Sequence, residues 1–453
     1  MRTLTKLLGT RAVGFALFVM CWIAADPSEG ADLLDLYLQA QSSDPTYQSA
    51  RYALEAARQK RPEAFSGLLP ALIASGSDGH TQGRTRYTDT PTINRGFNAD
   101  QWALQLTQPV FRADRLLAYG EAKAAVEQAI AQYEAAREDL MLRLSRAYFD
   151  TIVAEQRVTA ARAQLVALNE QLQAAQHGFD AGVASITDVD DTRSRTASAQ
   201  AEEVGAMNDL ESARATLEAI IGAPPERLAP LRADAALPKP FPSDVVSWVE
   251  QATANNPNVK AAEALAKAAD YEVDRNRAQR LPSVDLVASY GANYSGGNIT
   301  DPINYDTNVR DKQINLQVTM PLLDGGGIHA QVAAARAQHS KALSDVSAAQ
   351  RQAALDARQS FAAALSGASQ VQALQTAVSA GQSAVKGNQV GYKLGIRINS
   401  DVLNAEQQLY STMHDLDKAR YDTLYAGLKL KAATGQLAEE DLRGVNSLLE
   451  HSP

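Results

Sequence analysis

Two hydrophobic patterns alternate along this chain, and each occurs twice. At 101–111 and again at 313–323, apolar and polar residues alternate with a period of two, which is typical of a half-buried strand. The same alternation over 282–294 places apolar and aromatic side chains on one face. These patterns predict four strands, at about 70–80, 100–110, 282–294 and 311–322. Between them lie turn-rich stretches, at 77–98 and 295–310, that predict loops.

A long helix is predicted after each pair of strands. From 113 to about 177 there is no proline and one glycine, and apolar residues recur at alternating steps of four and three, as in a heptad seam. At about 1.5 Å per residue, this helix would be on the order of 100 Å long. Its twin is expected over 328–390. Glycines interrupt both patterns, and shorter helices at 187–221 and 400–434 follow; we therefore expect turns at Gly182, Gly391 and Gly395.

The chain is an internal duplication. A shift of 212 positions aligns Pro45 with Pro257 and Pro70 with Pro282; a shift of 213 later aligns Gly182 with Gly395 and Asp188 with Asp401. A repeat this long predicts two copies of one unit. We therefore expect an α+β protein with a duplicated strand–strand–long helix–short helix unit. The first repeat is 31–222, the second 244–435, with a Pro-rich linker at 223–243 and a tail at 436–453.

The N-terminus has the pattern of a secretory signal peptide. Basic residues precede an apolar stretch at 12–24 that is short for a membrane-spanning helix. We assign 1–30 to the signal, and cleavage after Ala25 or after Gly30 both fit. Cys21 is the only cysteine. Lipid attachment favours a small residue before the cysteine and Met20 is large, so we expect Cys21 to leave with the signal. No later segment has 18 consecutive apolar residues, so no transmembrane helix is expected.

Composition excludes several classes of function. The 453 residues are 45% hydrophobic, with a net charge of −9 and no long basic run, which argues against nucleic-acid binding. The six histidines lack the spacing of metal ligands, and the glycines at 325–327 lack the lysine of a phosphate-binding loop. The sequence predicts no enzyme, no metal and no cofactor.

The predicted strands raise a problem of closure. Four strands of about ten residues cannot close a sheet, and an open edge is not tolerated in lipid. A water-soluble sheet is one solution. The other is a barrel shared between chains, because three chains would supply twelve strands. The apolar faces of two strands would then contact lipid: Trp102, Leu104 and Leu106 in one, and Ile314, Leu316 and Val318 in the other. Trp102, Tyr290 and Tyr294 fit an interfacial girdle or ordinary sheet packing equally.

Four sequence stretches carry a family resemblance: "QPVF" (108–111), "MPLLDGGG" (320–327), "GFDAGVASITDV" (178–189) and "GYKLGIRINSDVLNAEQ" (391–407). With them, nearly the whole chain resembles the TolC-like outer membrane efflux proteins, the outer membrane factors. The resemblance implies a homotrimer with a 12-stranded barrel in outer membrane lipid and a long α-helical tunnel across the periplasm. It also implies two partners, a periplasmic adaptor (membrane fusion) protein and an inner-membrane pump of the RND or ABC type. The implied function is the exit duct for efflux or for type I secretion.

The resemblance also assigns residues to a gate. Thr187 and Asp188 in the first turn, with Tyr392 and Arg397 in the second, would link neighbouring helices at the periplasmic tip. Helix capping is the alternative, since Thr187, Asp188, Asn399 and Ser400 stand where the returning helices start.

A pore constriction is assigned next to the second turn. Asp401 would project into the narrowest bore, where three copies form a ring that favours cations; complementing the helix dipole is the alternative. Asn404 stands where the family often has a second Asp, so we expect weaker cation affinity.

A soluble periplasmic coiled-coil adaptor or scaffold is the competing function. It would share the signal peptide and the long helical hairpins. Adaptors need lipoyl-like and small barrel modules and usually have one hairpin, whereas this sequence predicts two hairpins with strands beside each long helix. The pattern therefore favours the duct.

Overall fold

The computed structural model describes residues 32–450. The expected signal peptide, its two cleavage sites and Cys21 lie outside the described residues, as do the last three residues of the expected tail. The elements follow in the order α1 (Leu33–Ser43), α2 (Pro45–Ser66), β1 (Ala71–Thr85), β2 (Ile93–Phe111), α3 (Ala113–Asp180), α4 (Ile186–Ile221), α5 (Val245–Asn255), α6 (Pro257–Ala278), β3 (Ser283–Ser295), β4 (Thr307–Thr319), α7 (Gly327–Lys393), α8 (Asn399–Ala433) and α9 (Glu439–Asn446).

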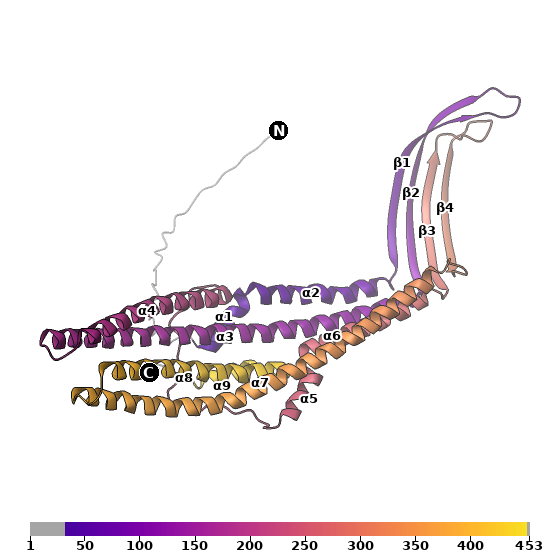
Figure 1. Cartoon of the computed structure of the whole chain (residues 1–453). Helices are drawn as coiled ribbons and strands as arrows, with labels where there is room; N and C mark the ends of the chain where they lie inside the picture. The colour runs from indigo at the N-terminus through magenta and orange to yellow at the C-terminus, as the bar shows by residue number, and fades with distance from the viewer. Residues whose placement is uncertain (1–31, 451–453) are drawn as a thin grey trace, which may run out of the picture.

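Two long helical hairpins form the body of the molecule (Figure 1). Helix α3 has 68 residues and α7 has 67, so each is about 100 Å long. Helices α4 and α8 return along them. Small residues are abundant where helices meet, as with Ala266, Ala269 and Ala342 between α6 and α7, and this allows their close approach. No helix among residues 32–450 is long and apolar enough to cross a membrane.

The strands form one antiparallel sheet in the order β1-β2-β3-β4, and it projects from the far end of the helices (Figure 1). The pairing of β2 with β3 joins the two repeats. The first hairpin is longer than the pattern predicts: residues expected in a loop continue the ladder to the pair Thr85–Ile93. Polar side chains support this extension, because His80 bonds Asn98 (2.7 Å) and Arg84 donates to Asn94 (3.1 Å). A composition of turn-formers does not reveal such cross-strand bonds.

The largest buried core lies midway along the helices. It joins α1, α3, the end of α4, α8 and α9, with Tyr148, Phe149 and Leu217 almost fully buried. The linker between the repeats is anchored to this core at two points: Tyr148 donates to the Ala229 carbonyl (2.8 Å), and the Leu231 N–H donates to the Tyr421 hydroxyl (2.9 Å). The two hairpins are therefore held together at the waist as well as through the sheet.

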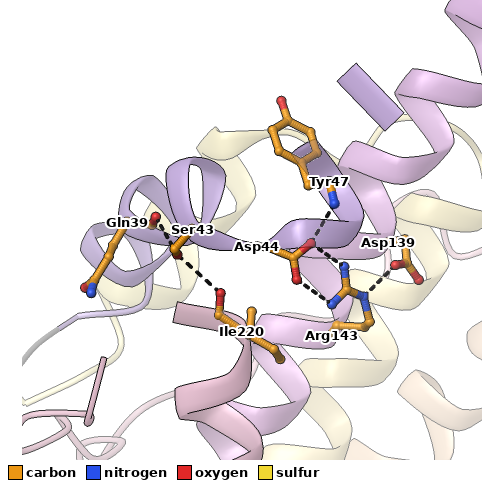
Figure 2. A network of polar contacts seen from close by, with 7 residues as sticks. All are labelled: Gln39, Ser43, Asp44, Tyr47, Asp139, Arg143 and Ile220. Atoms are coloured by element: carbon orange, nitrogen blue, oxygen red, sulfur yellow. Dashed lines mark hydrogen bonds and ion pairs between the residues drawn. The ribbon is translucent and has the colours of Figure 1, made fainter. Parts of the chain in front are cut away.

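A buried ion pair fixes the junction of α1 and α2 at this waist (Figure 2). Asp44 accepts the Tyr47 N–H (2.6 Å) and caps α2, with Pro45 at the first helical position. Arg143 on α3 donates two hydrogen bonds to Asp44, at 3.0 and 3.2 Å. Burial alone would raise the pKa of Asp44, but the bonds from Arg143 and from backbone N–H groups outweigh it and lower that pKa.

The second repeat makes the same junction with a neutral residue. Asn256, which the 212-residue shift aligns with Asp44, caps α6 by accepting the Asn258 N–H (2.9 Å). Its amide also donates to the Ala433 carbonyl (3.0 Å). The duplicated chain thus keeps the cap and replaces the ion pair by a hydrogen bond to α8.

Candidate functional site

The end of the hairpins far from the sheet is built from two turns of the same design. In the first, Gly182 has a φ of +74°, and the N–H groups of Val183 and Ala184 donate to the Gly178 carbonyl (2.9 and 3.1 Å). In the second, Gly395 has a φ of +72°. A residue with a side chain rarely adopts this left-handed conformation, so both glycines are required by the reversal.

The second turn also explains Gly391. The N–H groups of Ile396 and Arg397 donate to its carbonyl (2.9 and 3.2 Å). A Cβ atom at Gly391 would lie 2.7 Å from the Arg397 side chain, so any larger residue would displace that side chain. Gly178 is its counterpart in the first repeat. The sequence prediction missed Gly178 as a turn residue, although the 213-residue shift aligns it with Gly391.

Thr187 and Asp188 take part in capping α4. Ser185 is the N-cap residue, and its hydroxyl accepts the Thr187 N–H (3.2 Å), while the Asp188 carboxylate accepts the Ser185 N–H (3.2 Å). Within the described chain, no hydrogen bond or ion pair joins these two residues to Tyr392 or Arg397. One copy of the chain therefore does not bring the four predicted gate residues together.

The predicted constriction residues each have a cationic neighbour. Arg397 lies 3.6 Å from Asp401 in an ion pair, with side chains 57% and 36% exposed. Arg195 on α4 donates to Asn404 (2.9 Å) and also to Asp191 (3.2 Å). The exposed pair is worth little energetically, so Arg397 remains free to change partners. The contact of Arg195 with Asn404 was not predicted.

Polar side chains join the two hairpins just above the turns. Glu406 on α8 accepts from Gln171 of α3 (2.6 Å) and from Gln389 of α7 (2.9 Å). Asn399 donates to Thr192 of α4 (2.9 Å). The sequence did not predict these contacts; it suggested Asn399 as a helix cap, whereas the N-cap of α8 is Ile398. A signal was present for Glu406 and Asn399, since each lies three and four residues from Val402 and Leu403, the spacing of one helix face.

The tip also exposes apolar side chains. Val183, Leu394, Ile396 and Ile398 are all well over half exposed. They cluster at the two turns, where a soluble helical hairpin would normally carry polar residues. A concentrated apolar surface of this kind marks an interaction site.

The sheet has one largely apolar face that the chain does not cover. Trp102 packs edge-on against Tyr290, with ring centroids 5.4 Å apart, and the ammonium of Lys312 lies 5.3 Å from the Tyr290 centroid. Ile314 is 77% exposed, and Leu316 and Val318 exceed 60%. These side chains share one face because the strand period is two. Leu104 and Leu106 are on the same face.

Paired hairpins of about 100 Å, ended by a small sheet with an apolar face and two open edges, define an outer membrane channel class of fold. A model of the family described as "Outer membrane efflux protein" matches residues 36–223 and 248–436. The chain is 32% identical over 419 residues to the alkaline protease secretion protein AprF of Pseudomonas aeruginosa, covering 90% of this chain and 85% of that protein. It is 30% identical to the outer membrane protein TolC of Escherichia coli over 430 residues, or 93% of this chain and 86% of TolC.

Solved structures show the same fold. The Campylobacter jejuni CmeC outer membrane channel aligns with a TM-score of 0.76 at 16% identity, covering 98% of each chain. The Vibrio cholerae outer membrane protein VceC aligns with a TM-score of 0.74 at 20% identity, covering 89% of this chain and 96% of that chain. The chain belongs to the outer membrane efflux protein family. TolC and VceC are named as outer membrane proteins and CmeC as an outer membrane channel, names that fit a channel and not an enzyme or a soluble adaptor.

Proposed function

We propose that three copies of this chain form the exit duct of a tripartite efflux or type I secretion system. The observation that carries the proposal is the sheet: four strands with an apolar face and two unpaired edges, placed at the end of helices about 100 Å long. An open edge is not tolerated in lipid. Three such sheets joined edge to edge form a 12-stranded barrel with no edge, and the helices then continue it as a periplasmic tunnel.

The relatives support both transport roles. AprF and the PrtF protein of Dickeya chrysanthemi are named as protease secretion proteins, while BepC of Brucella suis is named as an outer membrane efflux protein. Each role needs an inner-membrane pump, of the ABC or RND type, and a periplasmic adaptor. The exposed apolar residues at the two turns are the surface on which we place the adaptor.

We further propose that the turns form the gate. The Arg397–Asp401 pair is exposed and weak within one chain, so Arg397 has the freedom to reach Asp188 of a neighbouring copy, with Tyr392 as a second hydrogen-bond donor. Asp401 then faces the bore as an acidic ring. Arg195 is itself paired with Asp191, so it only partly offsets this ring, and Asn404 adds no second ring.

Conductance in planar bilayers tests this proposal. The double variant Tyr392→Phe/Arg397→Ser is expected to conduct more than the parent, since both gate links are removed. Arg51→Ser/Tyr52→Phe is the matched control, because Arg51 stacks on exposed Tyr52 of α2, away from the turns; its conductance should equal that of the parent. Unchanged conductance in the first variant would refute the gate, and protein recovered only in the soluble periplasm would refute the duct.

A further inference from the structure

The two open edges of the sheet carry opposite charges on the same face. On the face that holds Trp102, the edge strand β4 carries Arg310 and Lys312. The edge strand β1 carries Asp78, and farther out Arg84, which donates to Asn94. Asp78 lies one row beyond Trp102, toward the end of the sheet away from the helices. Arg310 is in the row of Trp102, and Lys312 is in the row of Leu104 and Tyr290. The two edges are therefore chemically complementary to each other, although they lie on opposite sides of one chain.

Asp78 lacks a cationic partner in its own chain. Its directly paired residue on β2 is Asp100, and like charges opposite each other destabilise a sheet. Among the ion pairs formed by residues 32–450, none involves Asp78, Asp100 or Arg310. The carboxyl pair at the β1 edge is thus left without a cation from its own chain and is suited to accept one from another copy.

Barrel geometry selects which residue supplies that charge. The strands of such a barrel are about 4.8 Å apart and tilted by about 35–45°, so the register must shift by roughly 4 to 6 residues from one copy to the next. We call this shift the stagger. Only an even stagger keeps the lipid-facing side chains of neighbouring copies on the same face. Across its own sheet, Asp78 is in line with Asn308. A stagger of four toward the helices brings Asp78 opposite Lys312 of the neighbouring copy; a stagger of six makes these two diagonal neighbours.

The apolar rows support the same direction. With these staggers, Ala74 meets Leu316 or Val318 of the next copy, and apolar side chains stay beside apolar side chains. A stagger of four in the opposite direction would set Leu72 opposite Arg310. That arrangement would leave Arg310 beside an apolar side chain and far from Asp78, and an unpaired charge in the apolar belt is costly.

We propose that Asp78 of each copy pairs with Lys312 of the next, and that this contact sets the register of the three seams. The inference rests on the proposed trimer. The partner is a second copy of this chain. The acidic residue on the β1 edge of one copy recognises the basic residue on the β4 edge of the next.

Cysteine cross-linking measures the register directly. In a Cys21→Ser background the chain has no other cysteine. Ala74→Cys is combined in turn with Lys312→Cys, Ile314→Cys, Leu316→Cys and Val318→Cys, which correspond to staggers of zero, two, four and six. The strongest intersubunit cross-link is expected with position 316 or 318. A maximum at 312 or 314 overturns the register, as does the absence of any cross-link in a protein that still conducts. A background protein that neither forms trimers nor conducts would instead overturn the proposed channel.

Charge exchange tests the pair itself. Lys312→Asp is expected to lower the temperature at which the trimer dissociates by several degrees, because it adds a third carboxylate beside Asp78 and Asp100. Adding Asp78→Lys should restore most of the loss. The control adds Lys341→Glu instead, an exposed lysine of α7 that pairs with Asp345, and should restore nothing. A double variant no more stable than Lys312→Asp alone would refute the pairing.

Discussion

Arg143→Ala isolates the buried junction at the waist of the molecule. The Asp44 side chain is 3% exposed and loses both hydrogen bonds from the guanidinium. Removing one partner of a buried ion pair costs about 3–5 kcal/mol. We expect the lower end, about 3 kcal/mol, because Asp44 keeps the Tyr47 N–H and Arg143 is itself one-third exposed. At about 2 °C per kcal/mol for a chain of this size, the melting temperature should fall by about 6 °C.

The second repeat supplies the control for this variant. Asn256 makes the equivalent cap without an arginine, so Asp44→Asn/Arg143→Ala should keep the cap and carry no buried charge. Its stability is expected to return to within about 1 kcal/mol of the parent, the size of one hydrogen bond. If the double variant melts as low as Arg143→Ala, an unpaired charge is not the cause of the loss.

The pH dependence gives an independent check. In the parent the pKa of Asp44 is lowered, so its contribution is present above the unfolded carboxyl pKa of about 3.9 and is lost as the pH falls. In Arg143→Ala burial is opposed only by the backbone N–H groups, so the pKa of Asp44 rises. The deficit of the variant should therefore be larger at pH 8 than at pH 5. Thermal melts of the detergent-purified protein, followed by circular dichroism, measure it; equal deficits at the two pH values would contradict the reasoning.

Three further outcomes follow from single sites. Burial raises the pKa of Glu138 to about 8, so the folded state binds this proton more tightly than the unfolded state. Stability therefore falls as the pH rises from about 4.3 to 8. Glu138→Gln should flatten this fall in thermal melts, and an unchanged slope of melting temperature against pH would contradict it. Gly395→Ala forces alanine into a left-handed conformation at a cost of about 1–2 kcal/mol. Gly427→Ala, inside α8 with open space around it, should instead stabilise the fold by roughly 0.5–1 kcal/mol. If both variants shift the melting temperature in the same direction, the positive φ of Gly395 is not the cause. Asn404→Asp adds a carboxylate beside Arg195 at the proposed constriction, so divalent cations should block the channel at lower concentrations in planar bilayers; unchanged block would place Asn404 outside the bore.

The parts of the fold that periodicity predicts are those set by local packing. The long helices and the positions of their turns follow from heptad steps and from glycines, because each depends on neighbours a few residues away. The far half of the first hairpin was missed because residues rich in glycine and asparagine are held as strands by partners across the ladder, such as Asn98 beside His80.

The site was predictable in part for the same reason. Gly182, Gly391 and Gly395 are required by the turn itself. The contacts between the hairpins were not, because residues such as Gln171 and Glu406 lie 235 positions apart and neither differs in type from a solvated helix residue. The contacts among the gate residues depend on other copies of the chain, and the pattern of a single chain does not predict them.

The buried waist also sets the mechanics of the tip. From Phe149 in the core to Asp180 at the end of α3, the helix extends about 45 Å without another large core. It therefore acts as a stiff arm with its pivot at the waist. A rotation of only about 5° there displaces the turn by about 4 Å, more than the length of any hydrogen bond at the tip. Small rearrangements at the waist, far from the entrance, are thus sufficient to separate contacts at the entrance.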